Sequence, residues 1–95
     1  MIDVKINFLS LLADITKIKE INLSINENST IKEILDKLVA KFGKNFESKI
    51  LESPESLNKY IILGLNGKDI RTLDNLDTVV NHNDEILLLP AIAGG

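Results

Sequence analysis

The last five residues, Ala91-Ile92-Ala93-Gly94-Gly95, are of types that suit a tail able to enter a narrow pocket. Glycine has no Cβ, so the backbone at Gly94 and Gly95 can pass through a tight channel and adopt the dihedral angles that a pocket imposes. Five extended residues span roughly 15 to 18 Å, at about 3.3 to 3.6 Å per residue. We therefore expect Ala91, Ile92, Ala93 and Gly94 to form an insertion segment that presents the carboxylate of Gly95.

That carboxylate has a defined chemistry. A free α-carboxyl group has a pKa of about 3.3 to 3.7, so it is ionised at neutral pH and is a poor electrophile. It must be activated, for example as a mixed anhydride, before a nucleophile attacks it. We expect the carboxylate of Gly95 to be the working group of the protein.

Other reactive groups are few. The chain has no cysteine, and its one histidine, His82, lies between two asparagines in a polar turn, so no metal site is expected. The segment 64–68 contains two glycines and a lysine but lacks the spacing and the Ser or Thr of a phosphate-binding loop. Its Asn66-Gly67 pair predicts a β-hairpin instead.

Length and composition predict one globular domain. The chain has 95 residues, of which 44% are hydrophobic and 26% charged, with a net charge of -3. The lysines are scattered and Arg71 is the only arginine, so nucleic acid is not an expected partner. No apolar stretch is long enough for a membrane span and no signal peptide is recognisable, so we expect a cytoplasmic protein without a membrane partner.

The first half of the chain predicts two strands and a helix. Alternating apolar residues predict strands over Ile2–Phe8 and residues 21–25. Thr30 and Glu33 have the spacing of a capping box, and an apolar stripe with a period of 3 to 4 residues continues to Phe42. Gly43 is expected to end this helix with a left-handed residue. The helix should pack on a sheet through its apolar stripe.

The second half predicts three more strands. Residues 44–59 are polar and read as a connection, followed by a strand over 60–65, the Asn66-Gly67 turn and a short edge strand over 68–71. Residues 85–89 are apolar on both faces, which places this last strand at the sheet centre, parallel to the first. Pro90 cannot donate a ladder hydrogen bond, so the chain is expected to leave the sheet there.

The order of elements is that of an α+β protein with a β-grasp, or ubiquitin-like, fold. We expect a mixed sheet of four to five strands with one main helix on it, a domain over residues 1–90 and a flexible tail over 91–95. For Leu87 and Leu89 a core role is the simpler interpretation, and contact with a partner is the alternative. Together with Pro90 and Ile92 these residues form the predicted partner interface.

The ending over residues 83–95 resembles that of the small subunit of molybdopterin synthase, the MoaD family. The shared features are a turn with Asp-Glu, an apolar strand, a proline and a small-residue tail that ends in Gly-Gly. Residues 2–12 and the helix over 30–42 also follow that family's layout. Residues 86–88 and 92–95 are similar as well to the thiazole-pathway carrier, ThiS.

The resemblance implies a sulfur carrier that is not itself an enzyme. An E1-like, MoeB-like partner would adenylate Gly95 with ATP, and sulfur would then displace AMP to leave a thiocarboxylate. In a hetero-oligomer with a large, MoaE-like subunit that holds the catalytic residues, this group would supply sulfur to the dithiolene of molybdopterin, for a molybdenum or tungsten cofactor. The carrier itself would bind no cofactor.

Three alternatives stay open. The activated Gly95 could be transferred to lysine amines, which would make the chain a ubiquitin-like protein modifier. The sulfur could instead serve thiazole synthesis, although residues 44–59 are longer than the equivalent part of those carriers, or tRNA thiolation. Finally, the domain could be a plain β-grasp interaction module with an inert terminus.

Overall fold

The computed structural model describes residues 1–91 and contains a five-stranded mixed sheet in the order β2-β1-β7-β5-β6. β1 (Ile2–Phe8) pairs antiparallel with β2 (Glu20–Ile25) and parallel with β7 (Glu85–Pro90). β7 also pairs antiparallel with β5 (Ile61–Leu65), which turns into β6 (Lys68–Asp69). The predicted β-grasp fold is confirmed, including the central last strand and its parallel alignment with the first.

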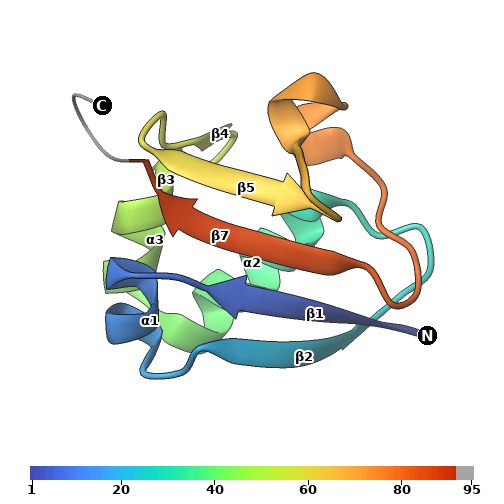
Figure 1. Ribbon diagram of the computed structural model, residues 1–95, viewed down its shortest axis with the longest axis horizontal. Helices are drawn as coiled ribbons and strands as arrows, with labels where there is room; N and C mark the ends of the chain where they lie inside the picture. Colours follow the sequence, from blue (N-terminus) through green and yellow to red (C-terminus); the bar gives the residue numbers. More distant parts are fainter. Residues whose placement is uncertain (92–95) are drawn as a thin grey trace.

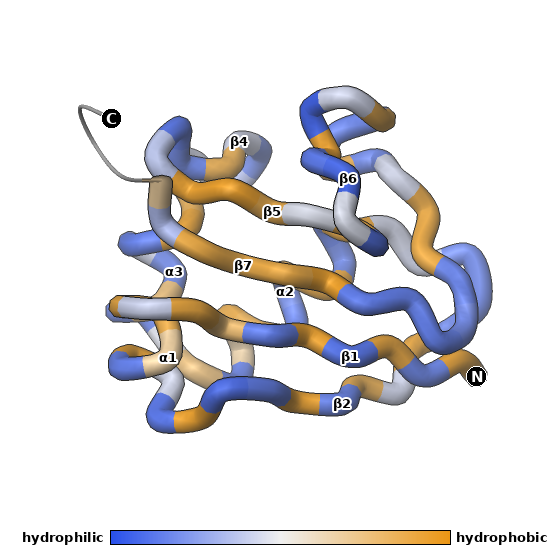
Figure 2. The backbone as a smooth tube through the Cα atoms, in the orientation of Figure 1, coloured by the Kyte–Doolittle hydropathy of each residue, from blue (hydrophilic) through white to orange (hydrophobic). Residues whose placement is uncertain are grey.

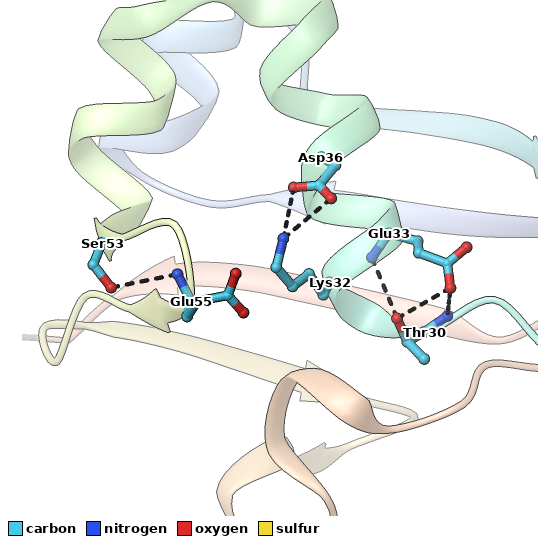
Figure 3. Close-up of polar contacts among 6 residues, drawn as sticks. All are labelled: Thr30, Lys32, Glu33, Asp36, Ser53 and Glu55. Carbon is cyan, nitrogen blue, oxygen red and sulfur yellow. Dashed lines mark hydrogen bonds and ion pairs between the residues drawn. The ribbon is translucent and has the colours of Figure 1, made fainter.

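Helices cover one face of this sheet and leave the other open (Figure 1). The main helix is α2 (Ile31–Phe42), which buries Ile31, Ile34, Leu35 and Leu38. Its capping box is confirmed, because the Glu33 N–H donates to Thr30 Oγ1 and the Thr30 N–H donates to Glu33 Oε1, each at 3.4 Å (Figure 3). The helix ends at Gly43, which has a positive φ of 88° but, with ψ at -168°, is not in the left-handed helical region.

Residues 44–59, predicted only as a polar connection, have secondary structure of their own. This segment contains α3 (Lys44–Ile50) and a small hairpin of β3 (Leu51–Ser53) and β4 (Ser56–Leu57). Phe46 and Ile50, four residues apart on one side of α3, are fully buried. Two apolar residues are too few to show a helical period in the sequence, so only packing against the core reveals this helix.

The predicted hairpin at Asn66-Gly67 is confirmed, with φ values of 52° and 87°. The edge strand that follows is shorter than predicted: β6 ends at Asp69, and the chain continues into the 3-10 turns η1 (Ile70–Thr72) and η2 (Asn75–Asp77). The Asp69 carboxylate accepts the Arg71 N–H at 2.9 Å and so starts η1. Burial of Ile70 then holds this turn against the domain.

A tight turn at Ser10 joins β1 to a short helix, α1 (Leu11–Thr16). Neither the turn nor the helix was predicted from the sequence. Ser10 has φ 57° and ψ -130°, a conformation that glycine adopts readily and other residues adopt at a cost of about 1 to 3 kcal/mol. The Leu12 N–H closes the turn on the Leu9 carbonyl at 3.2 Å. Ser10 therefore stores strain between β1 and α1.

Ser10→Gly is expected to raise the free energy of unfolding by about 0.5 to 1 kcal/mol. The change relieves backbone strain in the folded state, and the greater conformational entropy of glycine in the unfolded chain offsets part of this gain. Urea denaturation followed by circular dichroism measures it. The matched change Ser48→Gly, inside α3, should lower the free energy of unfolding by about 0.5 to 1 kcal/mol. Destabilisation by both changes would contradict a strained Ser10.

Candidate functional site

The predicted tail follows directly from the end of β7. We expected strand pairing to stop at Pro90, but Pro90 lies opposite Ile61 and the Ala91 N–H donates to the Tyr60 carbonyl at 2.6 Å. The missing N–H of Pro90 costs nothing here. Successive residues direct their amides to opposite sides of a strand, so this nitrogen lies on the side of β1, which has already ended at Phe8.

Ala91, the last described residue, is half-buried. The other residues predicted to form the tail, Ile92, Ala93, Gly94 and Gly95, lie outside the described residues. The prediction for the Gly95 carboxylate therefore stays a prediction. What the structure describes is the surface around Ala91, the last described residue.

The alternation of β7 divides its leucines between the two faces of the sheet. Ile86 and Leu88 are buried in the core under the helices. Leu87 and Leu89 point to the open face and are half-buried, as is Pro90. The core interpretation of Leu87 and Leu89 was wrong, because the sheet has helices on only one side.

Other apolar residues complete this surface. Leu89 lies opposite Ile62 of β5, and Tyr60, just before β5, is 55% exposed. Figure 2 shows the hydrophobic stretch along β7 and the adjoining start of β5. We call Tyr60, Ile62, Leu87 and Leu89 the exit face. Tyr60 and Ile62 were not predicted as contact residues, although the alternation in residues 60–65 already placed them on the side opposite to Ile61 and Leu63.

Over β1 and β2 the open face carries polar side chains. Lys5 Nζ lies 3.9 Å from Glu85 Oε1, and Ser24 Oγ donates to Asp3 Oδ1 at 2.7 Å. His82 lies at the same end of β1, where its Nδ1 accepts the Asp3 N–H at 3.0 Å. This exposed histidine therefore tethers a turn. The apolar contact surface of the open face is concentrated at the exit of the chain.

Within residues 1–91, no group of three or more His, Asp or Glu side chains is arranged to hold a metal ion. The pKa of Asp69, the last residue of β6, is lowered, mainly because its carboxylate accepts hydrogen bonds from the side chain and N–H of Arg71 in η1. No helix in the described part of the chain has the length and apolar character needed to cross a membrane.

Comparison with known proteins adds a family context. The model of the ThiS family matches residues 6–95. A candidate sulfur carrier protein of Archaeoglobus fulgidus is 33% identical over 69 residues, which are 73% of this chain and 77% of that protein. The molybdopterin synthase sulfur carrier subunit of Arabidopsis thaliana is 28% identical over 94 residues, 99% of this chain and 84% of that one.

A solved structure has the same fold and a different name. The small archaeal modifier protein 1 of Methanosarcina acetivorans superposes with a TM-score of 0.85 and 28% identity, over 100% of this chain and 98% of that one. Chains similar to this one are thus named both as sulfur carriers and as a protein modifier.

Proposed function

Because the chain belongs to the ThiS family, we propose that it is a sulfur carrier that works through the carboxylate of Gly95 and is the small subunit of a molybdopterin synthase. Similarity to the sulfur carrier subunit of Arabidopsis thaliana supports the choice of pathway. The single observation that carries the proposal is the exit face. It is an apolar contact surface beside Ala91, the last described residue, and so supports a partner contact close to the terminus.

The proposed chemistry begins with activation. An oxygen of the Gly95 carboxylate attacks the α-phosphorus of ATP on an E1-like partner, pyrophosphate leaves, and an acyl adenylate forms. A sulfur nucleophile then attacks the acyl carbon and displaces AMP, which leaves a thiocarboxylate. The chain contains no cysteine, so no internal thiol can intercept the activated terminus. The thiocarboxylate then supplies sulfur to the dithiolene of molybdopterin.

The domain serves in this scheme as a handle for partners. An exposed apolar patch with a polar surround is typical of surfaces that bind other proteins. Leu87 and Leu89 are the β7 residues of the exit face, and the Lys5–Glu85 ion pair lies on the polar part of the open face next to them. A partner that covers the exit face would receive the last residues in its active site.

Intact-mass analysis tests the chemistry. The protein is isolated from its native host, and separately incubated with ATP, the adenylating partner and a sulfur source. Replacement of one terminal oxygen by sulfur adds about 16 Da, and this form should then convert a dithiolene precursor in the presence of the large subunit. Only the free carboxylate under all these conditions would overturn the proposal, and transfer to a thiazole precursor alone would reassign the pathway.

Leu89→Lys should weaken binding to the adenylating partner by about thirtyfold or more, because a charge in the centre of an apolar contact loses about 2 kcal/mol or more. Calorimetry with the purified partner measures this. The control is Asn22→Lys, which places the same charge on β2 at the polar side of the open face. Equal weakening by both variants would show a general charge effect and contradict a specific role of the exit face.

Protein modification is the second candidate, and similarity to the small archaeal modifier protein 1 favours it. The same acyl adenylate would then react with a lysine amine, so that an amide bond forms and AMP leaves. Digestion of native-host extracts with a protease that cleaves after alanine, followed by mass spectrometry, should reveal Gly-Gly remnants on lysines of other proteins if this occurs. Cleavage must follow Ala93, because the nearest Lys or Arg before the tail is Arg71. A detectable thiocarboxylate without such remnants would count against it.

A further inference from the structure

The strand β2 forms an open edge of the sheet. It lies at one end of the strand order, and β1 is its only strand neighbour in the described part of the chain. In Figure 1 it is the lower border of the sheet, with no further strand below it. All six of its residues pair with β1 in one unbroken register. The outer side of β2 is therefore a long and regular edge.

The register identifies the backbone groups on this edge. The Phe8 N–H donates to the Lys19 carbonyl at 2.8 Å, so Lys19 and every second residue after it direct their backbone groups to β1. The alternate residues, Glu20, Asn22 and Ser24, direct theirs away from the sheet, and all three are exposed. Among residues 1–91, their N–H and carbonyl groups have no backbone partner. These three residues can therefore accept a further strand.

The edge lacks the features that usually keep exposed strands from pairing. A proline, a β-bulge or a lysine within the strand commonly protects such an edge. The sequence of β2 is Glu-Ile-Asn-Leu-Ser-Ile, and its register with β1 contains no bulge. Lys17 and Lys19 lie before the strand begins, and Glu27 lies just after it ends. The segments that flank β2 are thus basic on one side and acidic on the other.

Two copies of β2 match when they run antiparallel with Asn22 opposite Asn22. Glu20 of each copy then lies opposite Ser24 of the other, and three residue pairs are each joined by two backbone hydrogen bonds. Symmetric registers centred on Ile21 or Leu23 leave only two such pairs. The register centred on Asn22 is therefore the one that uses every free backbone group of the edge.

The side chains are complementary in the same register. On the helix-covered side, half-buried Ile21 lies opposite Leu23 of the second copy, so two apolar pairs form across the contact. On the open face the central pair consists of two neutral asparagine side chains. The antiparallel direction also brings Lys17 and Lys19 of one copy towards Glu27 of the other, whereas a parallel copy would place lysine beside lysine. Charge and register thus favour a second copy of this chain as the occupant of the edge.

We propose that the chain forms a symmetric dimer through its β2 edges, in which the two sheets join into one. The two-fold axis passes between the paired Asn22 residues, perpendicular to the sheet, so the open faces of both copies lie on the same side. In each copy β1 separates this contact from β7, so the exit face stays free for a partner. The dimer does not depend on the chemistry at Gly95.

Sedimentation velocity and amide hydrogen exchange of the full-length chain, measured from micromolar to millimolar concentration, test the dimer. The sedimentation coefficient should rise with concentration towards that of a dimer. Exchange of the Asn22 and Ser24 amides should slow by about tenfold or more, because each gains a hydrogen bond that must open first. The Leu23 amide, already directed to β1, is the internal control and should change much less. A monomer at every concentration, or a dimer that leaves Asn22 and Ser24 exchange unchanged, would overturn the proposal.

Charge substitutions test the register. Asn22→Lys places two lysines opposite each other and should weaken dimerisation by about fivefold or more. Asn22→Glu should have the same effect, but an equimolar mixture of the two variants should form a heterodimer, because lysine then lies opposite glutamate. Failure of this mixture to associate would contradict the register centred on Asn22. The matched control is Asn45→Lys, an exposed position of α3 away from β2, which should dimerise as the parent does.

Two other results would assign the association elsewhere and overturn the proposal. Equal weakening by Asn22→Lys and Asn45→Lys would show a general charge effect. Loss of the dimer in Leu89→Lys but not in Asn22→Lys would place the contact on the exit face. Binding of Asn22→Lys to the adenylating partner should match that of the parent, because the exit face is unchanged. Failure of the dimer is thereby distinguished from failure of the proposed carrier function.

Discussion

Deletion of Gly94 and Gly95 is expected to reduce formation of the acyl adenylate by more than about a hundredfold. The deletion moves the terminal carboxylate back by roughly 7 Å along the extended chain. A misplacement of about 1 Å can already cost about a hundredfold when reacting groups must be aligned. ATP–pyrophosphate exchange with the purified adenylating partner measures this first step, and intact mass measures the thiocarboxylate that follows.

The control for this truncation is a chain with one glycine added after Gly95. It keeps both native glycines but moves the carboxylate by about 3.5 Å, so it should also lose activity if position matters. The free energy of unfolding of both variants should stay within about 0.5 kcal/mol of the parent, as for surface changes away from the core. Full adenylation of the truncated chain would show that Gly95 is not the working residue.

Phe8→Ala is expected to lower the free energy of unfolding by about 3 to 5 kcal/mol, the usual cost of removing a buried aromatic side chain. Phe8 is 1% exposed and lies opposite Leu88 at the end of the β1–β7 pairing. Its ring centroid is 5.6 Å from that of Phe42 and 5.9 Å from that of Phe46, both in edge-to-face geometry. This aromatic cluster joins α2 and α3 to the sheet.

Urea denaturation of Phe8→Ala and of Tyr60→Ala distinguishes the loss of core packing from the mere loss of an aromatic side chain. Tyr60 is 55% exposed, so its removal should cost less than about 1 kcal/mol. The stability of a domain of this size is about 5 to 15 kcal/mol, so Phe8→Ala would remove a large share of it. A cost below about 1 kcal/mol for Phe8→Ala would contradict the central place of this cluster in the core.

Much of the fold could be predicted because its signals are local. The alternation in Ile2–Phe8, the capping box at Thr30 and the Asn66-Gly67 turn each act within a few residues, and all three were confirmed. α3 and the early end of β6 were missed for the opposite reason. The segment 44–50 forms a helix because this conformation packs both Phe46 and Ile50 into the core next to the end of α2. The edge strand ends before Ile70 because the chain turns there, which buries the Ile70 side chain.

The candidate site also has some features that the sequence predicts and others that only the folded structure reveals. The chemistry expected of Gly95 depends on residue types in the last five positions and on resemblance to a family, both of which are properties of the sequence. Which β7 residues face a partner depends on which face of the sheet the helices cover. The sequence showed an apolar strand, but Leu87 and Leu89 could be distinguished from Ile86 and Leu88 only in the folded sheet.

The sequence by itself determined the β-grasp class, the central and parallel last strand and the family, because periodicity, caps and turns are encoded between near neighbours. Tertiary structure alone decided that the exit face is open and that Ala91 is still paired to Tyr60. Each of these depends on contacts between segments far apart in the chain. Such contacts are set by how helices, hairpins and turns share one core, which no local pattern records.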